Sequence, residues 1–258
     1  MITRAVRTSV FKKQENLVAF IQKSIPSLKD GSILAITSKV VALSEGRVVA
    51  VKSEAQKQEL IRKESVWQFE TDSPWWLTVR DGSMVVNAGI DESNADGKIV
   101  LLPKDSFKAA DRLRKQLMSL YKVKSFGVVI TDSRISPLRA GVTGLAVGYA
   151  GFKGIRDYRG KKDIFGRKMS VTMTDVADSL ATAATLVMGE GTEQQPLAII
   201  EGAPVEFTER ANPQEVQIPL KDDLYAPLFT PTFLKKRGVN LPVSRPSRAS
   251  TRTPKRKE

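Results

Sequence analysis

Two runs of consecutive apolar residues are the strongest hydrophobic pattern in the chain. They span residues 32–37 (SILAIT) and 126–131 (FGVVIT), and the second run is rich in β-branched side chains, which favour strands. Shorter apolar runs indicate further strands at residues 48–51, 99–102 and 197–200. The sequence therefore predicts a sheet with at least two buried strands.

Apolar residues that recur every three or four positions predict helices between these strands. Pro26 is expected to end the first helix, because proline cannot continue the helical hydrogen-bond ladder. Asp105 or Ser106 can cap the second helix, whose pattern is the clearest in the chain. Two glycines are expected to end the third helix beside Glu190. The three predicted helices span residues 15–28, 105–123 and 175–188.

A glycine-rich segment spans residues 139–154 (RAGVTGLAVGYAGFKG). So many glycines suit a backbone that packs closely or approaches a ligand, and they equally suit an ordinary glycine-rich strand with turns. Strands and helices in this order do not repeat and do not form a regular βαβ series. The expected fold is α+β, with helices packed on a mixed sheet in one domain over residues 1–243.

The positive charge of the chain is concentrated in its last residues. The net charge is +13, and residues 235–258 hold nine basic residues and one acidic residue. Residues 244–258 are also almost free of apolar side chains, so we expect them to be a disordered basic tail. A solvated tail of this kind could bind nucleic acid only weakly, and a specific nucleic-acid arm is the alternative.

The chain contains no histidine and no cysteine. This absence excludes a Ser-His-Asp triad, thiolate catalysis, disulfides and sulfur-ligated metal sites. Oxygen ligands remain, and these select Mg²⁺ or Mn²⁺, which in enzymes most often hold the phosphates of a nucleotide. Neither a P-loop nor a dinucleotide-binding glycine motif occurs.

Polar residues follow several of the apolar runs, where α/β and α+β proteins commonly build sites. Each has a plain alternative: an Asp after a strand usually caps a turn, and a single Lys, Arg or Glu is usually a solvated surface group. From residue types alone, the chain is an α+β protein with candidates for a hard-metal site. These candidates are Ser38, Lys39, Asp91, Asn94, Asp132, Ser133, Arg139 and Glu190.

Five stretches of the chain together carry a family resemblance: SILAITSKVVALSEGRVV (32–49), VVNAGIDESN (85–94), VVITDSRISPLRAG (128–141), DIFGRKM (163–169) and DVADSLATAATLVMGEG (175–191). In sequence and in order they resemble the coenzyme F420-0:γ-glutamyl ligase family. The similarity spans roughly residues 1–205, and its most specific parts are the NAGIDESN and FGR segments. A bacterial branch described as folate-metabolism γ-glutamate ligases is a further resemblance.

The resemblance implies an enzyme that uses GTP or ATP to join the amine of L-glutamate to a carboxylate on F420-0, a deazaflavin, or on a folate-like pterin. It also implies two Mg²⁺ or Mn²⁺ ions per site, a distinctive α+β fold and a homodimer. By position, Asp91 and Asp132 match the ligands of the first metal, and Ser133 and Glu190 match those of the second.

Other positions match the nucleotide contacts of that family, and Arg139 matches an arginine near the reacting groups, so Asp132 and Arg139 are the expected catalytic residues. Lys39 and Arg139 could bind phosphate oxygens or substrate carboxylates. The expected nucleotide-binding residues are Ser38, Lys39, Asn94, Met188, Gly189, Glu190 and Gly191.

The chain departs from the family pattern where substrate should be recognised. Ser136, Leu138 and Val142 replace an Arg, a Trp and a Gln, and Leu43 replaces a Lys. These changes leave the nucleotide base and the acceptor open. A non-catalytic protein that binds nucleic acid through its basic tail is the alternative function. No apolar run is long enough to cross a bilayer and no secretory signal begins the chain, so a cytoplasmic location is expected.

Overall fold

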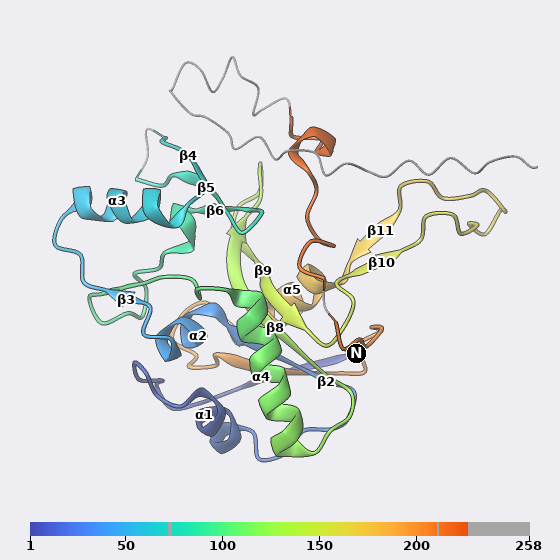
Figure 1. Ribbon diagram of the computed structural model, residues 1–258, viewed down its shortest axis with the longest axis horizontal. Coiled ribbons are helices and arrows are strands. Elements are labelled where there is room, and N and C mark those ends of the chain that lie inside the picture. The colour runs from blue at the N-terminus through green and yellow to red at the C-terminus, as the bar shows by residue number, and fades with distance from the viewer. Residues whose placement is uncertain (72–73, 211, 227–258) are drawn as a thin grey trace, which may run out of the picture.

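The computed structural model describes residues 1–71, 74–210 and 212–226. Its centre is a mixed five-stranded sheet in the order β1-β12-β2-β8-β9, with helices on both faces (Figure 1). The two central strands, β2 and β8, run parallel to each other, and the other pairs are antiparallel. The strands of this sheet are β1 (Ile2–Val6), β12 (Leu197–Glu201), β2 (Ser32–Thr37), β8 (Phe126–Ile135) and β9 (Val142–Ala150).

The central strands are apolar on both sides because each side faces a separate hydrophobic core. Leu34 and Val128 face one core, whereas Ile33 and Val129 face the other. All four side chains are fully buried. Helices α1 (Leu17–Ser24), α2 (Ser38–Ser44) and α4 (Ser106–Tyr121) cover the first core, and α5 (Val176–Met188) covers the second. The unbroken apolar runs in the sequence thus reflect a sheet that is covered on both faces, and the predicted α+β fold with a mixed sheet is confirmed.

Side-chain caps define where the predicted helices begin. The carboxylate of Asp105 accepts a hydrogen bond from the backbone N–H of Lys108 at 2.9 Å, as predicted for the N-cap of α4. Helix α1 ends one residue before Ile25, whose extended backbone is the conformation that the following Pro26 favours. The helices are α1 (Leu17–Ser24), α4 (Ser106–Tyr121) and α5 (Val176–Met188), each shorter than its apolar pattern predicted.

Helix α2 (Ser38–Ser44) was not predicted, since its first residues read as the exit of β2. Helix α3 (Glu54–Glu64) was also missed, because its sequence EAQKQELIRKE is largely polar and only Ile61 is fully buried. The expected strands at residues 48–51 and 99–102 are shorter than predicted. They form the two-stranded pair β3 (Val48–Val49) and β7 (Ile99–Val100).

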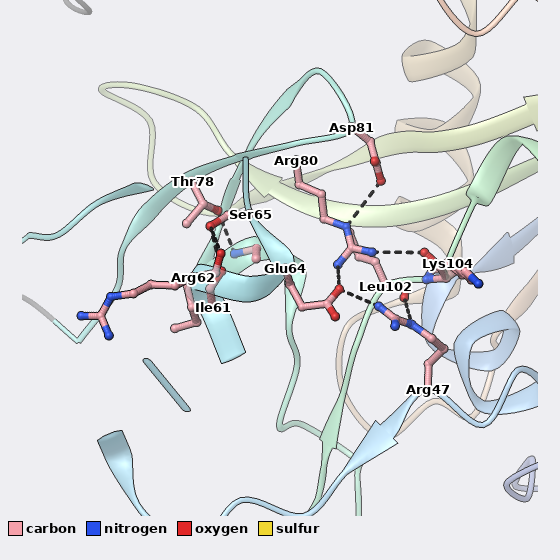
Figure 2. Close-up of polar contacts among 12 residues, drawn as sticks. Arg47, Ile61, Arg62, Glu64, Ser65, Thr78, Arg80, Asp81, Leu102 and Lys104 are labelled. Atoms are coloured by element: carbon pink, nitrogen blue, oxygen red, sulfur yellow. Dashed lines mark hydrogen bonds and ion pairs between the residues drawn. The ribbon is translucent and has the colours of Figure 1, made fainter. Parts of the chain in front are cut away.

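A small antiparallel sheet lies beside α3 and is joined to the rest of the fold by buried charges. Glu64 of α3 accepts hydrogen bonds from Arg47 and from Arg80, both at 2.6 Å (Figure 2). The two arginines also donate to the carbonyl oxygens of Leu102 and Pro103. The small sheet consists of β4 (Trp67–Phe69), β5 (Leu77–Arg80) and β6 (Ser83–Val86), and the 3-10 turn η1 (Asn87–Gly89) follows it.

The expectation that β8 leaves the sheet at Asp132 was wrong. The strand continues to Ile135 because β9 pairs with it along its whole second half, with a bulge between Ile130 and Thr131.

The glycine-rich segment supplies the strand β9, and its glycines also allow the close packing that was the other expectation. A Cβ at Gly144 would lie 2.4 Å from the carbonyl oxygen of Ala181 in α5, and one at Gly148 would lie 2.5 Å from the backbone of Ser106 in α4. Beyond β9, a hairpin projects from the side of the molecule opposite α3 (Figure 1). The hairpin strands are β10 (Ile155–Asp157) and β11 (Met173–Asp175), and a second 3-10 turn, η2, spans Leu220–Asp222.

The predicted basic tail, residues 244–258, lies outside the described residues. The single domain expected over residues 1–243 therefore remains a prediction. Among the residues that the structure does describe, none of the helices has the length and apolar character needed to cross a membrane.

Candidate active site

The parallel pairing of β2 with β8 brings the first candidate residues together. Thr37 at the end of β2 pairs with Thr131 of β8, so the residues that follow them, Ser38 at the start of α2 and Asp132 within β8, lie next to each other. The buried hydroxyl of Ser38 donates to a carboxylate oxygen of Asp132 at 3.3 Å. Two segments far apart in the sequence therefore meet through a hydroxyl and a carboxylate.

Lys39, the second residue of α2, connects this pair to the loop that follows η1. Its ammonium lies 2.7 Å from a carboxylate oxygen of Asp91 and donates to the carbonyl and the hydroxyl of Ser93 at 2.7 Å and 3.1 Å. The backbone N–H of Ser93 in turn donates to Asp91 at 2.6 Å. These oxygens satisfy all three N–H groups of Lys39. Lys39 therefore holds the Asp91 loop in place.

The end of α5 completes the site from a third direction. Gly189 ends the helix with a positive φ of 79°, a conformation that glycine adopts without strain. This turn brings Glu190 to Ser133, whose hydroxyl donates to the Glu190 carboxylate at 2.7 Å. The side-chain amide of Asn94 donates to the carbonyl oxygen of Gly191 at 3.2 Å.

These contacts form a closed circuit, which we call the polar ring. The circuit starts at α2 and passes to β8, to the loop after α5, to the Asp91 loop and back to α2. Side-chain contacts connect these segments to one another, and neighbouring residues connect the contacts within each segment. Every link is a hydrogen bond, an ion pair or a peptide bond. The members of the polar ring are Ser38, Lys39, Asp91, Ser93, Asn94, Asp132, Ser133, Glu190 and Gly191.

The two aspartates of the polar ring have opposite electrostatic environments. Burial, with the negative charge of Asp91, raises the pKa of Asp132 to about 7 despite hydrogen bonds from Ser133 and Ser38. Burial alone would also raise the pKa of Asp91, but hydrogen bonds and charge from Lys39, with hydrogen bonds from Ser93, hold it below its usual value. The two carboxylates are thus close enough to repel each other, which is the condition that a bound cation relieves.

The donor set fits a hard cation that is only partly held by protein. Among the described residues, no three acidic side chains lie together as a metal cluster. Mg²⁺ commonly takes one or two carboxylates and fills its remaining positions with water and substrate phosphate. Asp91 and Asp132, with the hydroxyls of Ser38 and Ser133, supply oxygen donors of that kind.

Three sequence-predicted residues, Arg139, Met188 and Gly189, do not join the polar ring. Arg139 lies in the exposed turn between β8 and β9, and its side chain makes no hydrogen bond or ion pair with the residues that the structure describes. Met188 is buried in the core between α5 and the sheet, with 6% of its surface exposed. Of the Met188–Gly191 loop, only Glu190 and Gly191 make polar-ring contacts.

Sequence reasoning missed two features of this region. Ser93 was not singled out, although it lies between the candidates Asp91 and Asn94 and gives Lys39 two of its three oxygen partners. Arg134, next to Ser133 on β8, forms an ion pair with Asp178 of α5 at 2.7 Å. Long-range partners of this kind carry no signal in a single sequence. The position of Ser93 within the DESN segment was the one usable sign.

Comparison with known proteins identifies the family. The model of the family described as F420-0:Gamma-glutamyl ligase matches residues 5–202. A coenzyme F420:L-glutamate ligase of Methanopyrus kandleri is 34% identical over 221 residues, which cover 79% of this chain and 87% of that protein. The protein of the same description from Archaeoglobus fulgidus is 33% identical over 210 residues, which cover 75% and 84%. One from Methanococcus maripaludis strain C7 is 36% identical over 199 residues, which cover 70% and 80%. The chain that builds the polar ring therefore belongs to the F420-0:gamma-glutamyl ligase family, whose members are C–N bond-forming ligases.

Proposed function

We propose that the protein is a nucleoside-triphosphate-dependent ligase that joins the amine of L-glutamate to a carboxylate of a deazaflavin such as F420-0 or of a folate-like pterin. Family membership supports the ligase reaction, and the names of the relatives support L-glutamate as a substrate. The observation that carries the proposal is the closure of the polar ring, because it gathers carboxylates, hydroxyls and a lysine where β2 ends beside β8.

Amide formation from a carboxylate needs an activated intermediate. A carboxylate oxygen of the acceptor attacks the γ-phosphorus of the nucleotide, which forms an acyl phosphate and breaks the bond to the nucleoside diphosphate. The glutamate nitrogen then attacks the acyl carbon, phosphate leaves, and the nitrogen loses a proton as the amide forms. Both steps develop negative charge on phosphate oxygens, so a site for them needs a fixed positive environment.

Each role proposed for a member of the polar ring follows from its residue type and its contacts. Asp91 and Asp132 would hold a Mg²⁺ or Mn²⁺ ion, and Ser133 with Glu190 would hold a second one. Bound there, such ions would neutralise charge on the triphosphate. Ser38 orients Asp132 through its hydrogen bond, and Lys39 orients Asp91.

Part of the polar ring would also contact the nucleotide. Asn94 fixes Gly191 and so positions the loop after α5, whose Glu190 and Gly191 are the proposed nucleotide contacts together with Ser38. Arg139 is free to reach the acceptor or a phosphate from the exposed turn of the β8–β9 hairpin.

We also propose that the protein is a homodimer. Light scattering of the purified full chain measures this directly.

The test is a reconstitution of the reaction. Purified protein is incubated with Mg²⁺ or Mn²⁺, with ATP or GTP, with L-glutamate, and with either F420-0 or a pterin acceptor. We expect phosphate release that depends on one acceptor, and a product heavier by one or more glutamyl units. A folded protein that releases no phosphate with any combination would contradict the proposal.

The substitution Asp132→Asn tests whether the polar ring carries out the reaction. We expect the substitution to lower kcat by about a hundredfold or more, because it removes a carboxylate that would hold the divalent ion needed to neutralise charge on the triphosphate. Asp111→Asn, on the exposed face of α4, makes the same chemical change away from the polar ring and should leave kcat unchanged. Circular dichroism of both variants reports whether the fold is retained.

A further inference from the structure

A cavity of about 330 Å³ adjoins the polar ring and is not used by the roles assigned above. Its wall includes Glu92, which directly follows Asp91 in the chain, and Lys57 from the first half of α3. The two are ion-paired at 2.5 Å. The loop that carries Asp91 therefore has the polar ring on one side and this cavity, which we call the lysine pocket, on the other.

The charges that line the lysine pocket are of both signs. Its cations are Lys52, Lys57 and Lys98, and its carboxylates are Glu54 and Glu92. Lys57 has only 16% of its side chain exposed, so its ammonium is held inside the wall. Lys98 is half-exposed, and its only ion pair among the described residues is a long contact of 3.8 Å with Asp96.

The size and remaining lining of the lysine pocket suit a small ligand. Val51 and Ile99 supply apolar surface between the charged groups. The volume of about 330 Å³ lies at the lower end of the roughly 300–1,000 Å³ of small-molecule sites. The start of α3, capped by Ser53, also contributes to the wall, and the dipole of a helix favours a carboxylate at that end.

We propose that the lysine pocket is the subsite for the amino-acid substrate L-glutamate, an inference that rests on the proposed ligase function. L-Glutamate carries two carboxylates and one ammonium, which matches a pocket that presents three lysines and two carboxylates. Charge-assisted hydrogen bonds from Lys57 and Lys98 hold the substrate carboxylates. Glu92 holds the ammonium, and because Glu92 adjoins Asp91, the nitrogen lies beside the polar ring.

A polyphosphate is the other anion that three lysines could attract. The two carboxylates of the lining argue against it, since Glu54 and Glu92 would lie against a ligand that carries no positive charge. The same carboxylates are complementary to an amino group. The mixed charge of the pocket therefore favours a zwitterionic amino acid over a nucleotide.

The experiment measures the affinity of L-glutamate and of a nonhydrolysable nucleotide analogue for the full chain, by calorimetry in the presence of Mg²⁺. Lys57→Met and Lys98→Met should each weaken L-glutamate binding by about tenfold, the effect of losing one charged hydrogen bond, and leave nucleotide binding unchanged. Lys98 lies outside the Lys57–Glu92 pair, so its variant keeps the Asp91 loop intact. Lys63→Met, an exposed position near the other end of α3, is the charge-matched control and should have no effect on either ligand.

In steady-state assays the same two variants should raise the KM for L-glutamate with little change in kcat. Glutarate, which lacks the amine, should bind the wild-type chain more weakly than L-glutamate does. L-Glutamate affinity that is unchanged in both variants overturns the subsite and leaves the ligase function standing. Lower nucleotide affinity in the two variants, with L-glutamate affinity unchanged, assigns the pocket to phosphate and also overturns it. A wild-type chain that neither binds nor incorporates L-glutamate refutes the ligase function itself.

Discussion

The carboxyl group of Asp132 lies half-buried between the hydroxyl of Ser38 and the charge of Asp91. Burial and that charge raise its pKa from 3.8 to about 7. The folded protein therefore binds a proton at this position more tightly than the unfolded chain does. Protonation of Asp132 therefore contributes to the free energy of unfolding. This contribution is fully present below about pH 4 and is lost as the pH rises through 7.

Asp132→Asn should therefore stabilise the metal-free protein at the same time as it lowers kcat by about a hundredfold or more. At pH 8 the amide removes a buried charge and its repulsion by Asp91, so the variant should melt several degrees above the wild-type chain. The difference should shrink as the pH falls toward 5, where the wild-type carboxyl is protonated. Melting curves in a chelator at both pH values check this. An equal or lower Tm for the variant at pH 8 would show that Asp132 is not electrostatically strained.

The hydroxyl of Ser133 can be tested separately from the aspartates. Ser133→Ala removes the donor to Glu190 and should lower kcat/KM by about ten- to a hundredfold, the usual cost of losing a partner that orients a ligand. Ser133→Thr keeps a hydroxyl on the same strand position and should retain activity within a few fold. Titration of Mn²⁺ into both variants, followed by electron paramagnetic resonance of the ion, shows whether the loss of activity comes from weaker metal binding. Equal activity of the alanine and threonine variants would remove Ser133 from the site.

At the scale of elements, one carboxylate links α3 to both the small sheet and the segment after α2. Glu64 lies between Arg47 and Arg80, and the exposed fractions of these side chains are 12%, 23% and 8%. Such a network is costly to break, because two guanidinium groups lose their shared partner while they remain partly buried. The same helix α3 contributes Glu54 and Lys57 to the wall of the lysine pocket.

Glu64→Gln should therefore lower the free energy of unfolding by about 2–4 kcal/mol, since an amide cannot neutralise either arginine. The matched control is Glu59→Gln, an exposed position on the same helix, which should change stability by less than about 0.5 kcal/mol. Urea unfolding followed by circular dichroism measures both. A Glu64 variant as stable as its control would show that the arginines find other partners in its absence.

The elements that could be predicted from the sequence differ physically from those that could not. β2 and β8 are covered on both faces, so their burial leaves an unbroken apolar run. Helix α3 lies at the surface, and its polar sequence EAQKQELIRKE shows no clear hydrophobic period. The strands of the small sheet are short, and β5 buries Thr78 and Arg80 while Leu77 and Val79 are only partly buried, so its apolar residues do not mark its buried face. The end of β8 was misplaced because pairing with β9, a long-range contact, prolongs the strand through the polar residues Asp132 and Ser133.

The candidate site shows the same limit. Residues at the ends of apolar runs could be named from the sequence, because a sheet edge is a common place for polar side chains. Their partners could not: Lys39 joins Asp91 across 52 positions, and Asn94 is 97 positions from Gly191. The resemblance to the ligase family supplied the grouping that local pattern lacks, and the structure supplied the contacts.

For the whole molecule, the polar ring and the lysine pocket draw on residues from Ser38 to Gly191, and the family model covers residues 5–202. All of the proposed chemistry therefore lies upstream of the basic residues at 244–258. The positive charge of that segment and the catalytic function are separable if the first 243 residues form a complete domain. This separation gives a direct comparison between the ligase and the nucleic-acid hypotheses.

A chain truncated after Val243 should keep the kcat and KM of the full chain and lose its binding to single-stranded DNA. The six basic residues of the removed segment bind phosphates by charge, so the binding of the full chain should also fall steeply with salt. A full-length variant with those six residues replaced by glutamine is the control, since it keeps the length of the segment and removes its charge. It should behave like the truncated chain in both assays, followed by phosphate release and by fluorescence anisotropy. If the truncated chain loses turnover and the glutamine variant keeps it, the segment belongs to the catalytic unit. If both variants still bind DNA, the nucleic-acid site lies on the described fold.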